Sequence, residues 1–185
     1  SYAGGYGAGG RVAVYQTVAT SFADGVTMRA TSGWGYSAGD KPDQHSCGTV
    51  YLQSAGEETD AGLCVISQRG GNSVGRSADG KVYPAGVELP AQNGDDVRRF
   101  RATNFKVTEG GALSLSDDLT INDLILDSAG TLRLNGHTLT IISRQHRRGK
   151  GWVDEKGVKT GLSGTVVLGG GHVRWMPRGL MLFVR

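Results

Sequence analysis

The stretch Gly111-Ala-Leu-Ser-Leu-Ser-Asp-Asp-Leu-Thr-Ile121 has two further copies in the chain. The copies read Gly130-Thr-Leu-Arg-Leu-Asn-Gly-His-Thr-Leu-Thr-Ile141 and, more loosely, Gly164-Thr-Val-Val-Leu-Gly-Gly-Gly-His-Val-Arg-Trp175. The second copy is longer than the first, because one residue is added in its turn. The third copy aligns with the second without a gap, from Gly164 opposite Gly130 to Trp175 opposite Ile141.

Each copy contains two short segments in which apolar and other residues alternate. In Leu113-Ser-Leu115 and its equivalents, alternation places both apolar side chains on one face of a strand. A single copy cannot bury that face, whereas stacked copies form a continuous apolar column. A period of about 20 residues with two strands per copy therefore predicts a stacked β architecture.

The composition agrees with an ordered β protein that has many tight turns. The 185 residues include 31 glycines but only 4 prolines, and the glycines separate leucine-rich and β-branched runs. No segment shows a helical period with caps. We predict an all-β fold with the following strands: 11–17, 26–31, 48–53, 62–67, 98–103, 106–108, 112–115, 119–121, 124–126, 131–134, 139–142, 165–168, 173–175 and 180–184, with weaker candidates around Val82 and Val87.

Two stretches add a resemblance to a known class of protein. Leu134-Asn-Gly-His-Thr-Leu-Thr-Ile141 resembles the turn-and-strand signature of right-handed parallel β-helix proteins. Gly4–Tyr15 and Gly48–Gln53 resemble the Gly-rich repeats of large secreted bacterial surface proteins, including autotransporter-passenger-like adhesins. The resemblance implies a parallel β-helix (β-solenoid) with coils of about 19–20 residues, used for adhesion, surface structure or polysaccharide cleavage. It transfers no catalytic residue to this chain.

We expect one domain with two additions. Residues 1–10 form a Gly/Tyr-rich N-terminal arm, and residues 11–185 form a single β-solenoid domain in which a charged loop at 143–160 interrupts the period. The net charge is +3, and from Arg144 onward there are nine basic and two acidic residues. Such a basic end suits an acidic glycan or another anionic surface, or is simply a solvated face.

Cys47 and Cys64 leave two interpretations open. A disulfide between them is slightly favoured, because the rest of the composition looks extracellular. Alternatively, both are small buried thiols. His45 lies two residues from Cys47 and would share a strand face with it, but no orienting acid is evident, so we interpret the pair as structural.

Four carboxylates, on Asp117, Asp118, Asp123 and Asp127, flank the repeat strands. Stacking would bring some of them to one edge, where a calcium ion or an acid/base pair could sit. Aspartates that hydrogen-bond the backbone of their own turns explain the same residues. We predict no catalytic residue, no metal site and no cofactor.

Several aromatic and basic side chains are candidates for contact with a ligand. Aromatic rings stack on sugars, and cationic side chains suit an acidic or cell-surface polysaccharide; nucleic acid is not the expected partner. Tyr51 and Trp175 are further aromatics, and Trp175 aligns with Ile141, so we assign it to the core. The ligand-contact candidates are Trp34, Tyr36, Arg144, Arg147, Arg148, Lys150 and Trp152.

The two ends of the chain suggest self-association. A β-solenoid leaves unpaired backbone groups at both ends, and we see no amphipathic helix that would cap either one. Either the chain is a segment of a longer protein, or copies stack or exchange strands into a homo-oligomer, fibre or surface layer. The self-assembly candidates are Tyr2, Tyr6, Leu180, Leu182 and Phe183.

We therefore expect a non-catalytic extracellular or cell-surface structural protein that assembles with itself. The alternatives are a carbohydrate-binding adhesin module and a polysaccharide lyase or hydrolase. The chain begins with Ser1 and not Met, which we interpret as a mature or excised product. We expect no membrane span, because the longest apolar run, Leu180–Val184, is far shorter than the ~20 residues that a spanning helix needs.

Overall fold

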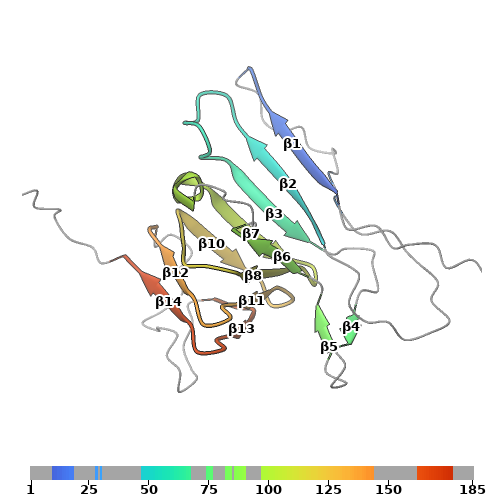
Figure 1. Cartoon of the computed structure of the whole chain (residues 1–185). Coiled ribbons are helices and arrows are strands. Elements are labelled where there is room, and N and C mark those ends of the chain that lie inside the picture. The colour runs from blue at the N-terminus through green and yellow to red at the C-terminus, as the bar shows by residue number, and fades with distance from the viewer. Residues whose placement is uncertain are drawn as a thin grey trace, which may run out of the picture.

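The structure is a computed structural model, and it describes residues 10–18, 28, 30, 47–67, 74–76, 82–84, 86–90, 97–143 and 162–176. These residues form strands and one short 3-10 helix, η1, so the predicted all-β class is confirmed (Figure 1). The elements are β1 (Arg11–Tyr15), β2 (Gly48–Gln53), β3 (Leu63–Ser67), β4 (Val74–Arg76), β5 (Val82–Pro84), β6 (Gly86–Leu89), η1 (Val97–Ala102), β7 (Asn104–Thr108), β8 (Ala112–Leu115), β9 (Leu119–Ile121), β10 (Asp123–Leu126), β11 (Thr131–Arg133), β12 (Thr138–Ile141), β13 (Thr165–Val167) and β14 (His172–Trp175).

Three sheets carry most of the structure. The five-stranded sheet has the order β1-β2-β3-β7-β10, the four-stranded sheet β13-β11-β8-β6, and the three-stranded sheet β14-β12-β9. From β7 onward the chain visits the five-, four- and three-stranded sheets in turn and then repeats the circuit with β10, β11 and β12. Each returning strand pairs in parallel with the strand of the previous circuit. A separate hairpin, β4–β5, forms a small antiparallel sheet.

The strand register matches the sequence repeat. Leu132 pairs with Leu113 at the start of the copies, and Leu139 pairs with Leu119 after the turn that holds the added residue. In the third copy, Thr131 pairs with Thr165 and Ile141 pairs with Trp175, so the gapless alignment is kept along its whole length. The predicted alignment of the copies is confirmed at the level of individual residue pairs.

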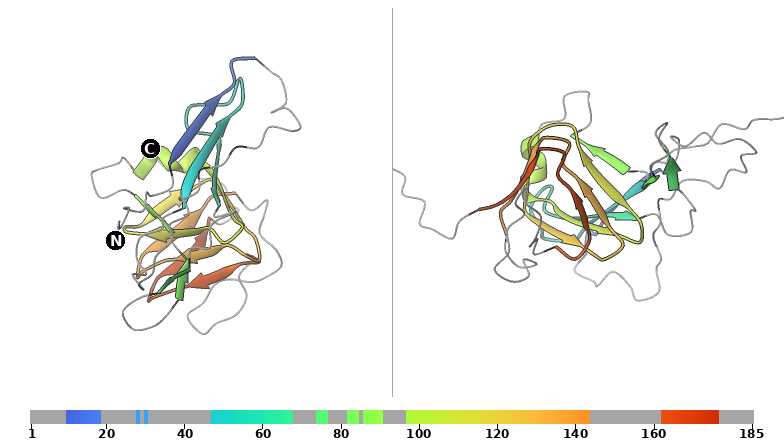
Figure 2. Two further views of the ribbon diagram at one scale, coloured as in Figure 1. Left: turned by 90° about the vertical axis from the view of Figure 1, so that its right-hand side faces the viewer. Right: turned by 90° about the horizontal axis from the view of Figure 1, so that it is seen from below.

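The three sheets surround a common interior, as the view from below shows (Figure 2). Buried hydrophobic side chains from all three sheets form one core cluster there. The leucines and isoleucines of the repeat are the inward residues of their strands, and they form the core because neighbouring strands bring equivalent side chains together. Trp175 lies in this core with 2 % of its surface exposed, which confirms its assignment. The fully buried core side chains of the repeat are Leu113, Leu115, Leu119, Ile121, Leu132, Leu134, Leu139 and Ile141.

The glycine that begins each copy is required because two backbones approach closely there. A Cβ atom on Gly130 would lie 2.5 Å from the carbonyl oxygen of Val107, and one on Gly164 would lie 2.3 Å from that of Asp127. Any side chain would therefore collide with the strand end of the preceding circuit. The repeat glycines thus mark the corner between the five- and four-stranded sheets.

Polar side chains also pair between successive circuits at the corners. Where the chain enters the five-stranded sheet, the Asn122 side-chain amide donates a hydrogen bond to Asn104 Oδ1 at 2.7 Å, and Asn104 in turn donates to the Ala61 carbonyl at 3.0 Å. At the next corner the Thr108 hydroxyl donates to the Asp127 carboxylate. These bonds satisfy polar groups that would otherwise be unpaired where the chain turns.

One end of the five-stranded sheet extends beyond the other two sheets (Figure 1). There β2 pairs antiparallel with β3, and β1 pairs in parallel with β2. The four-stranded sheet stops at β6 and the three-stranded sheet at β9, next to which η1 packs. Strands β1 and β2 therefore have no described sheet opposite them, and we call them the overhang.

The prediction of a strand at 98–103 is wrong, because Val97–Ala102 forms the 3-10 helix η1. Phe100 packs against Phe105 with ring centroids 6.1 Å apart, and the Thr103 N–H donates to the Phe100 carbonyl at 3.0 Å. This turn brings Phe100 over the end of the core in place of a strand. The expected strands 26–31 and 180–184 lie wholly or mostly outside the described residues.

Candidate functional site

The four aspartates singled out from the sequence divide between structural roles and one surface cluster. Asp127 accepts hydrogen bonds from the Thr108 hydroxyl and from the N–H groups of Ala129 and Gly130. Asp123 is buried, and its Oδ1 accepts from the Leu124 N–H at 3.0 Å. Both carboxylates therefore hold backbone turns. The other two, Asp117 and Asp118, are exposed and lie together.

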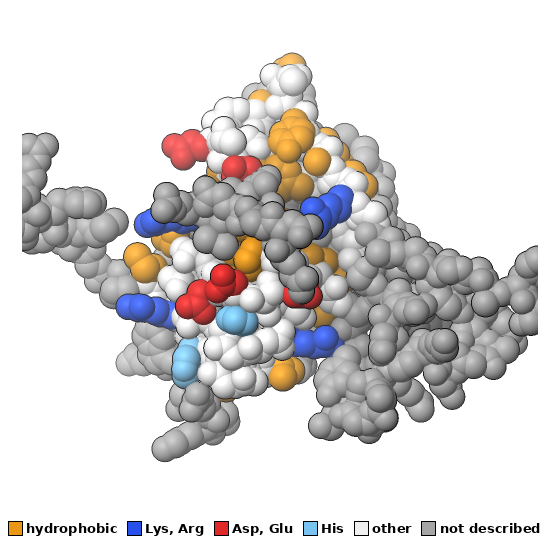
Figure 3. All heavy atoms as spheres, in the orientation of Figure 1, with side chains coloured by type: hydrophobic (Ala, Val, Ile, Leu, Met, Phe, Trp, Pro, Cys, Tyr) orange, Lys and Arg blue, Asp and Glu red, His pale blue; other side chains and the backbone are white. Residues whose placement is uncertain are grey.

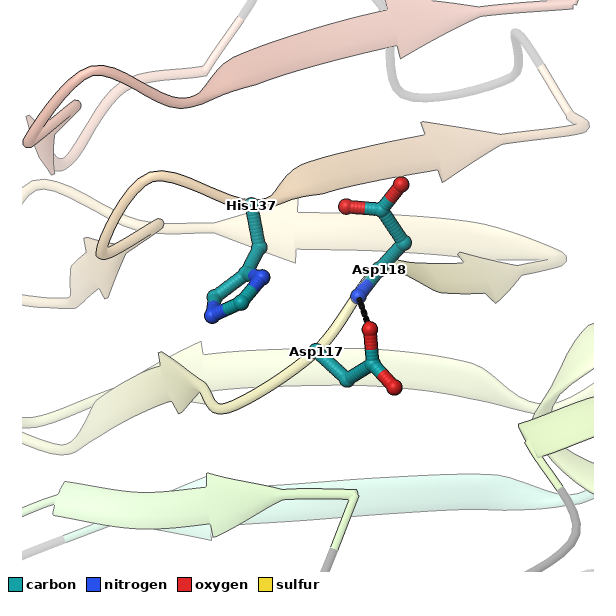
Figure 4. Close-up of side chains that lie close together, drawn as sticks. All are labelled: Asp117, Asp118 and His137. Atoms are coloured by element: carbon teal, nitrogen blue, oxygen red, sulfur yellow. Dashed lines mark hydrogen bonds between the residues drawn. The ribbon is translucent and has the colours of Figure 1, made fainter.

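Asp117 and Asp118 form a cluster with His137, here called the histidine–aspartate cluster (Figure 4). One ligand atom from each of the three side chains lies within 4.8 Å of the other two. The aspartates belong to the turn between β8 and β9, and His137 belongs to the turn between β11 and β12. Histidine and acidic side chains lie near one another on this face of the molecule (Figure 3).

The strand register explains why these side chains meet. Leu119 pairs with Leu139, so the two residues before each leucine lie opposite one another. Asp117 is thereby placed opposite His137, and the Thr138 N–H donates to Asp118 Oδ1 at 2.6 Å. Asp117 Oδ1 accepts from the Asp118 N–H at 2.7 Å, which orients the first carboxylate.

His137 is the residue of this cluster that the sequence reasoning missed. The signal was present, because the alignment of Leu119 with Leu139 also aligns Asp117 with His137. Carboxylate oxygens and an imidazole nitrogen are donors that divalent cations accept. The absence of a metal site stays a prediction.

A pocket lies under the overhang, between β1, β2, η1 and β7. This pocket has a volume of about 220 Å³, and buried apolar side chains, among them Phe105, form part of its wall. Tyr15 and Tyr51 line it with ring centroids 5.8 Å apart, and Arg11 and Asp60 add charge. Hydrophobic side chains gather over this part of the surface (Figure 3).

Tyr51 is fixed within this pocket by its hydroxyl group. The hydroxyl donates to Gln53 Oε1 at 2.9 Å and accepts from the Gly62 N–H at 3.1 Å. Partial burial raises the pKa of the Tyr51 phenol, so the neutral donor form persists. The ring is therefore held as a fixed wall of the pocket.

The expected disulfide between Cys47 and Cys64 is not formed, and both residues are free, buried thiols. Cys64 pairs with Tyr51, which is four residues along the chain from Cys47, so the cysteines are separated by roughly 13 Å along the strand direction. A disulfide requires Cα atoms less than about 7 Å apart. The alternative interpretation, two small buried thiols, fits the structure.

Both thiols are held in their neutral form. Burial raises the pKa of Cys47, and it raises the pKa of the Cys64 thiol to about 12. The Cys47 Sγ also lies 3.7 Å from the Ala112 carbonyl oxygen, to which it donates. A thiol with a raised pKa is a poor nucleophile, which agrees with the structural interpretation of Cys47. His45 is outside the described residues.

The other candidates named from the sequence lie outside the described residues. Of the charged loop, the structure describes Ser143, whose N–H donates to the Asn122 carbonyl at 2.6 Å. The ligand-contact and self-assembly candidates that lie outside the described residues are Trp34, Tyr36, Arg144, Arg147, Arg148, Lys150, Trp152, Tyr2, Tyr6, Leu180, Leu182 and Phe183.

Comparisons of the chain with protein-family models, with curated proteins and with solved structures found no match. Within the described part of the chain, no helix has the length and apolar character needed to cross a bilayer.

Proposed function

We propose that the chain is a parallel β-helix segment that acts as a non-catalytic, extracellular structural protein and assembles with copies of itself. The circuit through three sheets, in which each strand pairs in parallel with its equivalent in the previous copy, supports the β-helix part of the proposal. In such a fold each coil contacts only its neighbours, so the fold has no intrinsic length and can be extended by adding coils or copies.

The observation that carries self-assembly is the position of the exposed large hydrophobic side chains. Among the described residues these are Val12, Tyr15, Val18 and Val167, with exposed fractions of 36 %, 63 %, 66 % and 44 %. The first three lie on β1 or just after it, and Val167 lies on β13. Both β1 and β13 are outermost strands of their sheets, at opposite ends of the stack.

Outermost strands have backbone N–H and C=O groups that can pair with another chain. Apolar side chains on the same strands add buried surface to such pairing, which is the usual basis of strand addition between molecules. Contact between unlike ends is a head-to-tail contact, and this kind of contact produces open filaments when the rotation does not close a ring. A fibre or surface layer is the assembly that we propose.

The experiment compares single charge substitutions at the ends with one in the middle. Val12→Lys and Val167→Lys place a charge on an outermost strand and should lower association measured by sedimentation velocity over a range of concentrations. Thr140→Lys is the matched control, because Thr140 is half-buried on β12, which is paired on both sides. Wild-type protein that stays monomeric at the highest concentration would overturn the proposal.

A second candidate function, carbohydrate binding, is favoured by the pocket under the overhang. Its two tyrosine rings offer apolar faces, and Arg11, Asp60 and the Tyr51 hydroxyl add polar groups around them. Aromatic faces with a few polar groups suit a sugar ring. A glycan array tests this function: binding that Tyr15→Ala abolishes would support it, and an array without a single bound glycan would exclude it.

A further inference from the structure

We propose that the histidine–aspartate cluster binds a divalent transition-metal ion, of which Zn²⁺ is the reference case. Asp117, Asp118 and His137 each offer one ligand atom, and these atoms lie within 4.8 Å of one another (Figure 4). A metal ion bound at about 2.0–2.2 Å from each donor bridges donors up to about 4.4 Å apart. Small rotations of the two exposed aspartate side chains therefore suffice to close the site on the half-buried His137.

The imidazole is available for such a role. Within the described part of the chain, the His137 ring has no hydrogen-bond or ion-pair partner, although two carboxylates lie close to it. Each aspartate accepts one hydrogen bond from the described residues, and it does so through Oδ1. The Asp118 N–H donates to Asp117, and the Thr138 N–H donates to Asp118. An imidazole held near two carboxylates, but bonded to neither, leaves room for an ion between them.

The repeat itself does not require these residues. Its structural positions recur: Asn135 and Gly136 have φ of 50° and 87°, and their equivalents Gly169 and Gly170 have φ of 53° and 86°. By contrast, the position of His137 is Asp117 in the first copy and Gly171 in the third. Among the described turns, this set of donor side chains therefore occurs in one pair of neighbouring turns. A residue that the turn itself required would recur in every copy, whereas a residue of a specific site would not.

The donor types select the class of metal. One imidazole nitrogen with carboxylate oxygens suits Zn²⁺, Co²⁺, Ni²⁺ and Cu²⁺, whereas Ca²⁺ takes oxygen ligands alone. The three side chains leave at least one coordination position for water. Because the ligands come from the equivalent turns of two successive copies, the bound metal would join these turns and stabilise the folded chain.

The test is a titration of the full-length chain, without an affinity tag and after treatment with a chelator, with ZnCl₂ in a calorimeter. The expected result is saturable binding that His137→Gln weakens at least about tenfold, since one ligand is lost. His172→Gln is the matched control: His172 is exposed, starts β14 of the same sheet, and should not affect the affinity. Asp117→Asn should also weaken binding, and it keeps the side-chain oxygen that accepts from Asp118.

Three further readouts separate this site from unspecific binding. Co²⁺ should give a visible absorption spectrum that disappears in His137→Gln, and saturating Zn²⁺ should raise the unfolding temperature of the wild type but not of this variant. Ca²⁺ should bind no more weakly to His137→Gln than to the wild type. Absence of Zn²⁺ binding, equal affinity of wild type and His137→Gln, or loss of binding in His172→Gln alone would each overturn the proposal.

Discussion

The inward face of the five-stranded sheet differs between its enclosed part and the overhang. Where the other sheets lie opposite, the paired inward residues Leu124, Phe105 and Cys64 are buried. On β2 and β1 the same row continues with Tyr51 and Ala13, which line an open pocket. The strand pairing continues unbroken from β10 to β1, but burial of this row does not. Burial therefore depends on enclosure by the other sheets and not on strand pairing. Where enclosure ends, the half-buried Tyr51 follows Cys64 in this row, and three of the four exposed hydrophobic side chains that support self-assembly, Val12, Tyr15 and Val18, lie on β1 or just after it.

The largest expected effect comes from removing a leucine in the enclosed part. Leu132 is fully buried, so Leu132→Ala should lower the free energy of unfolding by about 2–5 kcal/mol. Leu52→Ala makes the same chemical change on β2, where the side chain is half-buried, and should cost less than half as much. Chemical denaturation measures both. Equal losses would break the distinction between the two regions.

A methyl group at the corner glycine should have the next largest effect. In Gly130→Ala the added Cβ would lie 2.5 Å from the Val107 carbonyl, so the backbones must separate, at a cost of about 1–3 kcal/mol. Gly10→Ala is the control, because a Cβ there meets no atom within 4 Å. A Gly130→Ala variant as stable as Gly10→Ala would show that the circuits are packed less closely than described.

Stability at alkaline pH tests the boundary between the regions, where Cys64 lies. Burial raises the pKa of this thiol from 9.0 to about 12. Between these values the unfolded chain releases the proton while the folded chain keeps it, so the free energy of unfolding falls as pH rises, by up to about 1.4 kcal/mol per pH unit. Cys64→Ala should show a shallower loss over the same window. An identical slope in both proteins would mean that the thiol is exposed.

The smallest predicted effect is confined to the overhang. Tyr51→Phe removes the hydrogen bonds to Gln53 and from Gly62, which should cost about 1 kcal/mol. The effect should be local, with faster amide hydrogen exchange in β2 and the turn before β3 and unchanged exchange in β11 and β12. Faster exchange throughout the chain would show that the overhang and the enclosed part unfold together.

Much of the enclosed part could be predicted from the sequence. The Leu-x-Leu pattern shows which faces are buried, and Gly111, Gly130 and Gly164 show where each copy starts, so the register followed directly. The antiparallel pairing of β2 with β3 was not predictable, because it lies outside the repeat. Helix η1 was also missed, because its apolar residues suit a strand as well as a turn over the end of the core.

The candidate sites also divide into a part that the repeat predicts and a part that it does not. The sequence identified Asp117 and Asp118, but His137 joined them only once the alignment of the copies was applied to the turns as well as to the strands. The pocket under the overhang depends on pairing between Cys64 and Phe105, which lie far apart in the sequence and outside any shared repeat. The prediction of a disulfide was wrong for a related reason, because the distance between the cysteines follows only from the register of β2 with β3.

The most direct test of the central claim is electron microscopy of the purified chain at increasing concentration, combined with sedimentation velocity. End-to-end assembly predicts particles of constant width whose length grows with concentration, and Val12→Lys and Val167→Lys should shorten them while Thr140→Lys does not. Particles that remain single and of constant length at every concentration would contradict it.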